Sequence, residues 1–433
     1  MNRRWLSIGL ILASLGLSVL AEPPATPAGA ADFFFKDGDA VVMLGDSITE
    51  QYLYSTYVEL WTITRFPSWS LTFRNVGIGG DTANGGKTRF QRDVVPHKPT
   101  ALTVDFGMND GGYGAFITNN FNSYAANLQA IANQAQSNKI RVAWLTPQPV
   151  EKPEEGPAVI AGYNLTLERY AEGVKSVAAT NNGLFVDQFH PYAQVMEKAR
   201  AADPKNRIGG GDAVHPGVPG QTVMASAILK GMNFPSLVSD AGIDAAALKV
   251  TKAEKCQITD LAMTADSVLQ FKRLDAALPF FPEAAKPVLQ WTPILEDLND
   301  YRLRVTGLKP GQYEIRLGGK KVAEYADTAL AQGVNLAACA LTSGPVADQV
   351  KAVVSAVQAK NDYFHASIFR GVTLAAVNVP DWFDPRIDAA AIDSQRKAAF
   401  EKRLEEMPRY DAAIRKALII QPHLVEIVPV AKP

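Results

Sequence analysis

The chain has 433 residues, 47% of them hydrophobic and 20% charged, and its 43 Lys and Arg nearly balance its 44 Asp and Glu. This is ordinary globular composition, which argues against a collagen-like or wholly disordered chain. With a net charge of −1 the chain has no long-range field to hold a polyanion, so we expect no nucleic acid partner. Cys256 and Cys339 are too few for a disulfide-rich scaffold or a thiolate metal cluster, although the two could pair with each other.

The N-terminus has the pattern of a secretory signal peptide at residues 1–21. A basic start precedes an uncharged apolar run, and small residues allow cleavage after Ala21 or Ala30. The run is about sixteen residues long, slightly short for a membrane-spanning helix, and a membrane anchor is the alternative. Residues 22–37 are predicted to be a linker rich in Pro and Ala. We therefore expect a periplasmic or extracellular protein with no stable membrane insertion after cleavage.

Residues 38–240 alternate between short apolar runs and helical patterns. The runs lie at residues 40–44, 71–76, 101–106, 141–145 and 183–187. Short apolar runs that end at Gly, Pro or a polar residue are typical of buried parallel strands. The stretches between them, such as residues 121–135 and 161–179, are typical of crossover helices. The sequence therefore predicts a doubly wound α/β sheet with its ligand at the carboxyl ends of the strands.

The second half of the chain has a different pattern. Alternation with period two at residues 301–305 and 313–317, with Gly-containing turns after each, predicts a β-meander within a β-rich accessory module at residues 241–337. Apolar residues at helical spacing then predict a helical C-terminal region at residues 338–433. We expect this tail to dock on the α/β domain, with binding of a partner or polymer as the alternative.

Gly45-Asp46-Ser47 follows the first predicted strand. A serine at a strand-to-helix turn is exposed at the ligand-binding edge, and its backbone N–H lies at a helix start. This position suits a nucleophile that also helps to bind an oxyanion. Taken alone the tripeptide is more typical of ordinary helix capping. The G-x-S-x-G elbow of α/β-hydrolases is absent.

The second and third strands end in groups that can donate hydrogen bonds. Asn-Val-Gly-Ile-Gly-Gly-Asp-Thr at residues 75–82 includes Gly80, whose backbone can approach a ligand closely. Thr82 stands where a dinucleotide-binding loop would need glycine. Asn109, within Gly-Met-Asn-Asp at residues 107–110, offers a neutral amide donor for an oxyanion. A tight turn and an Asx turn are the structural alternatives.

Asp212 and His215 follow the last predicted strand, after three consecutive glycines. The spacing D-x-x-H lets the carboxylate accept a hydrogen bond from imidazole Nδ1 while Nε2 faces the serine. We interpret the other histidines as structural or surface residues, namely His97, His190, His365 and His423.

Together these four blocks resemble the GDSL/SGNH hydrolase superfamily. The resemblance covers about residues 38–235, with every block in family order, and Ile48 stands where the name-giving motif has Leu. It implies a flavodoxin-like three-layer α/β/α sandwich with a five-stranded parallel sheet. It also implies a secreted bacterial esterase, lipase or acylhydrolase that needs no metal or organic cofactor.

The roles known in the family carry over onto the matching positions. They make Ser47 the nucleophile, His215 the general base and Asp212 its orienting partner. The oxyanion hole would consist of the N–H groups of Ser47 and Gly80 and the side-chain amide of Asn109. The resemblance thus implies a serine hydrolase that forms an acyl-enzyme on a carboxylic ester. We expect acetyl or short acyl groups on a small molecule or a polysaccharide.

The sequence leaves other interpretations open. One is a lipid-directed lysophospholipase or acylhydrolase, and another is a non-catalytic carbohydrate-binding protein on the same fold. A metallophosphoesterase is a third, because four residues of the blocks are candidate ligands for a hard metal, namely Asp46, Asp81, Asn109 and His215. Aromatic residues beside the blocks could stack on sugars or line an acyl pocket, namely Tyr52, Tyr54, Tyr57, Tyr113 and Phe116. The oligomeric state is not predicted.

Overall fold

The fold is seen in a computed structural model, which describes residues 32–151, 162–374, 382, 384 and 391–430. The predicted signal peptide and most of the predicted linker lie outside these residues. In the described part of the chain, no helix combines the length and the apolar character needed to cross a membrane. Phe35 is already fully buried and packs on Phe73, so the folded body begins before the end of the predicted linker.

The N-terminal half contains an all-parallel sheet of five strands. They are β1 (Ala40–Gly45), β2 (Thr72–Asn75), β3 (Ala101–Asp105), β4 (Arg141–Leu145) and β5 (Leu184–Val186). Their order is β2-β1-β3-β4-β5, so the chain reverses direction across the sheet between β2 and β3. Apart from β2, the strands are mostly apolar because helices cover both faces of the sheet. The predicted α/β fold class is confirmed.

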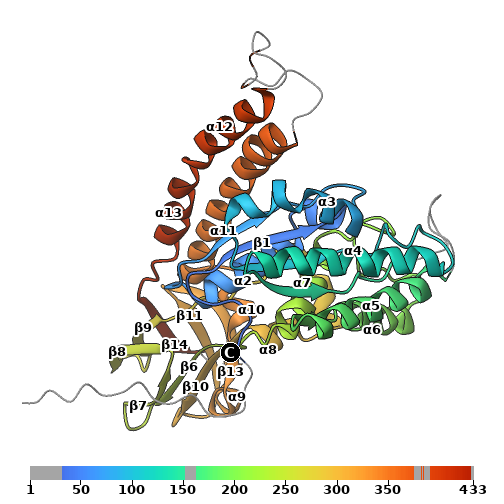
Figure 1. Ribbon diagram of the computed structural model, residues 1–433. Helices are drawn as coiled ribbons and strands as arrows, with labels where there is room; N and C mark the ends of the chain where they lie inside the picture. Colours follow the sequence, from blue (N-terminus) through green and yellow to red (C-terminus); the bar gives the residue numbers. More distant parts are fainter. Residues whose placement is uncertain (1–31, 152–161, 375–381, 383, 385–390, 431–433) are drawn as a thin grey trace, which may run out of the picture. The chain divides into compact units, whose positions relative to one another are not determined.

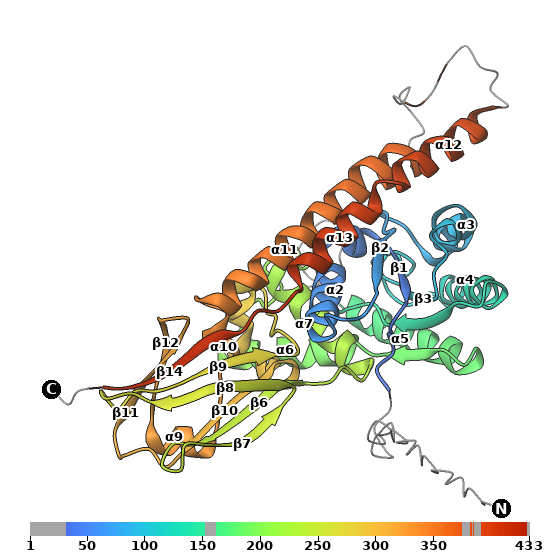
Figure 2. The ribbon, with the colours of Figure 1, turned by 90° about the vertical axis from the view of Figure 1, so that its left-hand side faces the viewer.

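Helices form a layer on each face of this sheet (Figure 2). They are α1 (Ser47–Glu50), α2 (Tyr54–Arg65), α3 (Ala83–Asp93), α4 (Thr118–Ser137), α5 (Tyr163–Thr180), α6 (Phe189–Ala202) and α7 (Val218–Gly231), and the short η1 (Val95–His97) follows α3. Val42 and Leu44 of β1 share one core with α3, α4 and α5, whereas Val41 and Met43 share the other with α2, α6 and α7. The alternation follows from the period of two along a strand.

The later strands form two further sheets, which together we call the β module. One sheet has the order β13-β10-β6-β7, with β6 (Leu237–Asp244), β7 (Lys249–Glu254), β10 (Asp300–Thr306) and β13 (Val334–Asn335). The other has the order β12-β11-β14-β9-β8, with β8 (Cys256–Met263), β9 (Leu269–Asp275), β11 (Gln312–Leu317), β12 (Lys320–Ala326) and β14 (His423–Pro429). The short helices η2 (Glu283–Gln290), α8 (Ile294–Leu298), α9 (Asp327–Gln332) and α10 (Ala337–Ala340) connect these strands.

The predicted β-meander is wrong in one respect. β11 and β12 do form a hairpin, but β10 lies in the other sheet, where it pairs in parallel with β6. Alternation identifies a strand without naming its partner, because one buried face can pack in more than one sheet. The predicted boundary at residue 240 also falls inside β6.

The C-terminal region contains the predicted helices and one strand that was not predicted. α11 (Pro345–Tyr363) continues as the π-helix η3 (Phe364–Thr373), and α12 (Ile392–Leu404) and α13 (Met407–Ala417) follow. β14 then returns to the β module and lies between β11 and β9. Figures 1 and 2 both show α13 running alongside α11.

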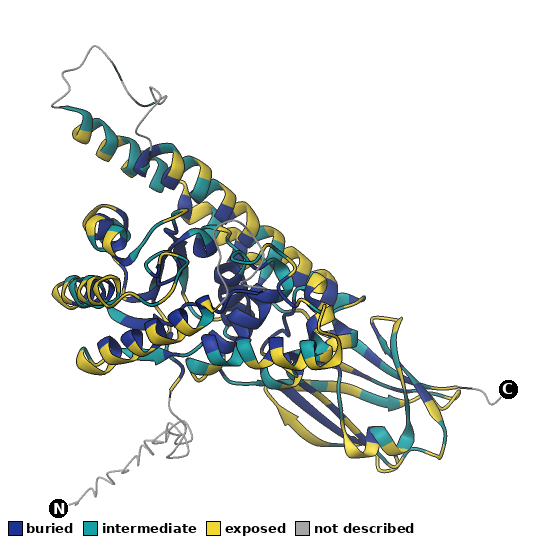
Figure 3. Ribbon diagram, turned by 90° about the vertical axis from the view of Figure 1, so that its right-hand side faces the viewer, coloured by how far each residue is buried: buried dark blue, intermediate teal, exposed yellow. Residues whose placement is uncertain are grey.

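Buried polar contacts join the tail to the α/β domain. In α11, Lys360 Nζ donates to Glu59 Oε2 of α2 at 2.7 Å, and Asn361 Nδ2 donates to Thr56 Oγ1 at 3.0 Å. The side chains of Lys360 and Glu59 are 1% and 6% exposed. Every residue of α2 is buried, and Figure 3 shows this buried centre in dark blue. The docking expected of the tail is therefore present.

Both cysteines are free and half-buried. Cys256 Sγ donates to the carbonyl of Asp240, and Cys339 Sγ donates to the carbonyl of Leu336. The disulfide left open by the sequence is not formed between them.

Candidate active site

Ser47 is the first residue of α1 and follows β1 after a single residue. Asp46 caps the helix, since its Oδ1 accepts a hydrogen bond from the N–H of Ile48 at 3.0 Å. This cap gives the helix a defined start at the carboxyl end of the strand. Ser47 is thereby presented at the edge of the sheet while its neighbours Asp46 and Ile48 are buried.

Ser47, His215 and Asp212 form a continuous hydrogen-bonded line. Ser47 Oγ lies 2.8 Å from His215 Nε2, and His215 Nδ1 lies 3.0 Å from Asp212 Oδ2. Asp212 Oδ1 also accepts the backbone N–H of Val214 and of His215 at 2.8 and 2.7 Å. Each spacing is within the range for a nucleophile, a base and an orienting group.

The Asp212 carboxylate is stabilised in its charged form. Partial burial on its own would raise the pKa of Asp212, but hydrogen bonds from the His215 backbone, the imidazole and the Val214 backbone outweigh it and lower the pKa. A carboxylate that stays ionised favours the His215 tautomer with its proton on Nδ1, which leaves Nε2 free to accept from serine. The electrostatics therefore agree with the geometry.

The loop after β2 comes close to α1. A Cβ on Gly77 would lie 2.4 Å from the backbone nitrogen of Glu50, so only glycine fits there. Gly80 has φ +72°, which L side chains rarely adopt. In the described part of the chain, neither the Gly80 N–H nor the Ser47 N–H has a hydrogen-bond acceptor. Both N–H groups are thus free to bind an oxygen atom.

The Asn109 side chain is held by three neighbours. Its Nδ2 donates to the carbonyl of Asp81 at 2.8 Å and lies 3.4 Å from Asp46 Oδ2. Its Oδ1 accepts from the Tyr113 hydroxyl at 2.6 Å. Burial raises the pKa of Tyr113 to about 12, so the phenol keeps its proton and donates. The Tyr113 hydroxyl therefore directs the amide NH2 of Asn109 away from itself, on the side of Asp46 and Asp81.

Two glutamines support the loop that carries His215, and neither was predicted. Gln221 of α7 is fully buried, donates to the Pro216 carbonyl at 2.8 Å and accepts from the Tyr54 N–H at 2.9 Å. Gln148 Nε2 donates to the carbonyl of Val214 at 3.2 Å. Gln148 belongs to the Thr-Pro-Gln-Pro segment after β4, whose sequence alone gave no sign of this contact.

Three carboxyl groups near the ends of β1 and β3 are withdrawn from solvent. Burial raises the pKa of Asp105 and of Asp110 to about 7 each. Burial, with the charge of Asp105 next, also raises the pKa of Asp46 well above its ordinary value. These groups therefore resist ionisation beside the site, which limits negative charge where an oxyanion would form.

The aromatic residues beside the blocks have unequal access to solvent. Tyr54 and Tyr57 are buried, and Phe116 packs on Phe121 and Tyr170. Tyr52 and Tyr113 keep partial exposure. Phe116 is half-buried as well, so stacking on a substrate is open to Tyr52, Tyr113 and Phe116 rather than to all five.

The described residues contain no group of three or more His, Cys, Asp or Glu side chains arranged to hold a metal ion. No cluster of that kind among the described residues supports the metallophosphoesterase alternative.

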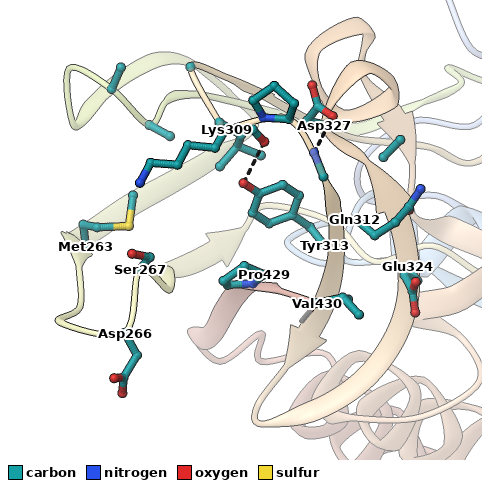
Figure 4. Close-up of a pocket in the computed structure, with 17 residues that line it drawn as sticks. Met263, Asp266, Ser267, Lys309, Gln312, Tyr313, Glu324, Asp327, Pro429 and Val430 are labelled. Atoms are coloured by element: carbon teal, nitrogen blue, oxygen red, sulfur yellow. Dashed lines mark hydrogen bonds between the residues drawn. The ribbon is translucent and has the colours of Figure 1, made fainter. Parts of the chain in front are cut away.

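A cavity of about 1090 Å³ lies in the β module and contains none of the predicted catalytic residues (Figure 4). The Tyr313 hydroxyl in its wall donates to the Lys309 carbonyl at 2.9 Å, and the Gly311 N–H donates to Asp327 Oδ1 at 3.0 Å. Polar groups in this wall are thus paired within the chain.

Residues 43–223 match the model of the GDSL-like lipase/acylhydrolase family. An acetylxylan esterase from Geobacillus stearothermophilus is 26% identical over 218 residues, which are 46% of this chain and 95% of that protein. The matched family range contains every residue predicted for the site, namely Ser47, Gly80, Asn109, Asp212 and His215.

The fold of nearly the whole chain is also found in a solved structure described as BT4096, a gut microbial diltiazem-metabolizing enzyme. The two chains are 24% identical with a TM-score of 0.77, and the match covers 92% of this chain and 98% of the other. This likeness shows a shared fold, and its coverage extends that fold to the β module and the helical tail.

Proposed function

Residues 43–223 form a domain of the GDSL/SGNH hydrolase superfamily and the chain is an ester-hydrolysing enzyme, and from this premise we propose that it works through a Ser47-His215-Asp212 triad and an acyl-enzyme. The observation that carries the proposal is the continuous line from Ser47 Oγ through His215 to Asp212, with contacts of 2.8 and 3.0 Å. Ser47 and the Asp212–His215 pair come from two loops 165 or more positions apart in the sequence, which favours a catalytic role over two independent turns.

In the proposed mechanism Ser47 Oγ attacks the ester carbonyl carbon while His215 Nε2 takes the hydroxyl proton. The carbonyl π electrons move to oxygen, and the resulting oxyanion accepts hydrogen bonds from Ser47 N–H, Gly80 N–H and Asn109 Nδ2. Collapse breaks the bond to the alcohol oxygen, which leaves with the proton from His215. Water then attacks the acyl-enzyme by the same steps and releases the acid.

We propose an acetyl or short acyl ester as substrate, carried by a small molecule or a neutral polysaccharide. The acetylxylan esterase relative supports an acetyl group, and the near-neutral charge supports an uncharged carrier. The lysophospholipase alternative would need a broad apolar surface for acyl chains, and the chain offers no apolar stretch of that kind beyond the N-terminus. The signal pattern of residues 1–21 supports export, which fits a polysaccharide substrate outside the cell.

One assay series tests these points. Purified protein is offered p-nitrophenyl esters of increasing acyl length, acetylated xylan, acetylated pectin and a lysophospholipid, with and without EDTA. We expect turnover of acetyl esters that EDTA does not affect. Ser47→Ala should be inactive, whereas the matched control Ser267→Ala in the β module should keep full activity. An active Ser47→Ala variant or preference for the lysophospholipid would contradict the proposal, and loss of activity in EDTA would favour metal-dependent chemistry.

A further inference from the structure

The π-helix η3 of the C-terminal tail reaches α1, the helix that begins at Ser47. Glu50, one turn after Ser47, forms an ion pair through Oε1 with Arg370 of η3. The same carboxylate accepts the N–H of Gly79 through Oε2 at 2.6 Å. Glu50 therefore connects a residue of the tail to the glycine that precedes Gly80.

Gly80 has no side chain and little packing around it to hold its peptide in place. Its φ of +72° leaves a flexible residue with open space around the Cα, because a Cβ there would meet nothing within 4 Å. Side-chain packing therefore does not hold the Gly80 peptide. The loop is instead held by hydrogen bonds of the residues next to Gly80. One of them is the bond from the Gly79 N–H to Glu50, and the peptide that follows it carries the Gly80 N–H proposed to bind the oxyanion.

The packing of η3 fixes the backbone from which Arg370 extends, while the Arg370 side chain itself is 49% exposed. Phe364, Ile368 and Phe369 of this helix are buried in the core that also contains Val76 and Phe90. The Phe364 ring lies 5.3 Å from His97, which follows α3. π-helices are uncommon and are frequently found at functional sites. Here the helix brings Arg370 to the Glu50 carboxylate from a part of the chain 320 residues away.

His365 is a second group near Glu50, with Nε2 at 3.8 Å from Oε1. Burial lowers the pKa of His365, although the charge of Asp362 partly opposes this, so the imidazole is neutral near neutral pH. Arg370 is then the residue that supplies positive charge to Glu50. A charged partner restricts the carboxylate rotamer more strongly than a neutral one, since charge-assisted hydrogen bonds are the stronger kind.

We propose that Arg370 is a positioning residue for the oxyanion hole, acting through Glu50 and the Gly79 N–H on the Gly80 peptide. The inference rests on the proposed function of Ser47 and Gly80, and it gives the helical tail a part in ester hydrolysis without contact with substrate. Displacing a donor should cost less than the 10²–10³-fold of deleting one, so loss of Arg370 should lower kcat on the order of tenfold.

The test compares Arg370→Ala, Arg370→Lys and Glu50→Gln in the full chain, with the exposed tail residue Arg409→Ala as matched control and Ser47→Ala as blank. We expect Arg370→Ala to lower kcat with KM within about twofold, as for an interaction realised in the transition state. Inhibition by methylboronic acid, a tetrahedral analogue, should weaken by a similar factor. Arg370→Lys should restore part of the kcat and part of the boronate affinity. The melting temperature of Arg370→Lys should match that of the parent protein.

Coupling separates positioning from a local structural effect. If Arg370 acts through Glu50, Arg370→Ala should add little to the loss already caused by Glu50→Gln. Unchanged kcat and boronate affinity in Arg370→Ala, with Ser47→Ala inactive, would overturn this inference and leave the proposed function standing. Fully additive losses would also overturn it. An active Ser47→Ala variant would overturn the proposed function and this inference with it.

Discussion

Asn109 shows how a single neighbour can decide what an amide does. Oxygen and nitrogen of an amide are alike in shape, and the hydrogen-bond partners determine which end faces the site. The Tyr113 hydroxyl donates to Oδ1, and the Asp81 carbonyl accepts from Nδ2. The partners therefore agree on one orientation, in which the NH2 group lies on the side of the candidate oxyanion hole.

Removal of this donor gives the first prediction. Asn109→Ala should lower kcat by roughly 10²–10³-fold, as expected for an oxyanion donor. Tyr113→Phe keeps the amide but frees it to rotate, so its loss in kcat should be smaller, with KM little changed. Steady-state kinetics on an acetyl ester measures both, with Tyr363→Phe in the tail as control. A Tyr113→Phe loss confined to KM would instead assign the phenol to substrate binding.

Asp105 gives a prediction about pH. Burial raises its pKa to about 7 in the folded chain, although hydrogen bonds from Gln188 and Tyr54 partly oppose this, whereas an unfolded Asp titrates near ~4. Between these values the folded chain holds a proton that the unfolded chain has released, so its free energy of unfolding falls as pH rises. Asp105→Asn cannot titrate, and its stability should fall less across this window.

Urea unfolding at pH 4.5 and pH 7.5 measures the difference. At pH 4.5 the Asp105→Asn variant should have a lower free energy of unfolding than the parent. At pH 7.5 this difference should be smaller or reversed. The exposed Asp266→Asn is the control. Parallel pH curves for Asp105→Asn and the parent would show that Asp105 is ionised throughout. Asp110, whose pKa burial also raises to about 7, leaves part of the slope in the variant.

Residues within one motif were easier to predict than residues that join motifs. Asp212 and His215 are three positions apart, so their contact follows from spacing, and Ser47 follows from its place after a strand. Gln221 and Arg370 carry no local pattern. Their contacts to Pro216 and Glu50 depend on where two distant loops or helices pack, which spacing does not encode.

At the scale of elements, the parallel strands were predicted closely and the β module was not. A strand covered on both faces is apolar throughout and ends at a turn, so its bounds are visible in the sequence. β14 follows Pro422, ends at Pro429 and alternates in burial over seven residues, but it comes shortly after α13 in a stretch whose helical spacing masked it. β10 alternates clearly, yet its parallel partner β6 lies about sixty positions earlier, and no turn signal marks that pairing.

α2 is the element on which the other parts of the chain meet. Its Glu59 binds Lys360 of the tail, and the ring of Trp61 lies 5.0 Å from that of Phe280, which precedes η2. The Arg65 guanidinium donates to the Leu298 carbonyl at 2.8 Å. A helix buried all round must pair its polar side chains internally. Its residues Glu59 and Arg65 are thus explained by docking rather than by the active site.

Breaking the Glu59–Lys360 pair gives the third prediction. Burial raises the pKa of Glu59 and lowers that of Lys360, and each partner's charge offsets part of this. Lys360→Met would leave a buried carboxylate without its partner and should reduce the free energy of unfolding by about 3–5 kcal/mol.

Lys351→Met, at an exposed position of the same helix, should change the free energy of unfolding little. The double variant Lys360→Met with Glu59→Leu should recover most of the loss, and no recovery would mean that the pair itself stabilises the chain. Chemical denaturation measures all four proteins.

For the whole molecule, β14 lies within the β module and the helical tail is a connection between two packed regions. β14 forms ladders with both β11 and β9, so the residues that follow α13 are central in their sheet. With both cysteines free, noncovalent packing holds this arrangement. One buried apolar cluster includes Met43 of the parallel sheet, Phe280 before η2 and Val425 of β14. The α/β domain and the β module therefore share a core.

A shared core predicts that residues 33–433 unfold in one cooperative transition. Calorimetry and the loss of esterase activity should then report the same midpoint temperature. Val425 is fully buried, so Val425→Asp would place an unpaired charge in this core and should lower the midpoint of both signals together. Glu426 lies next to it on the other face of β14, and Glu426→Gln should change neither signal. If Val425→Asp unfolded the β module in a separate, earlier transition while activity persisted to the parental temperature, the two regions would be independent domains. A single lowered transition would show instead that β14 stabilises the α/β domain that carries Ser47.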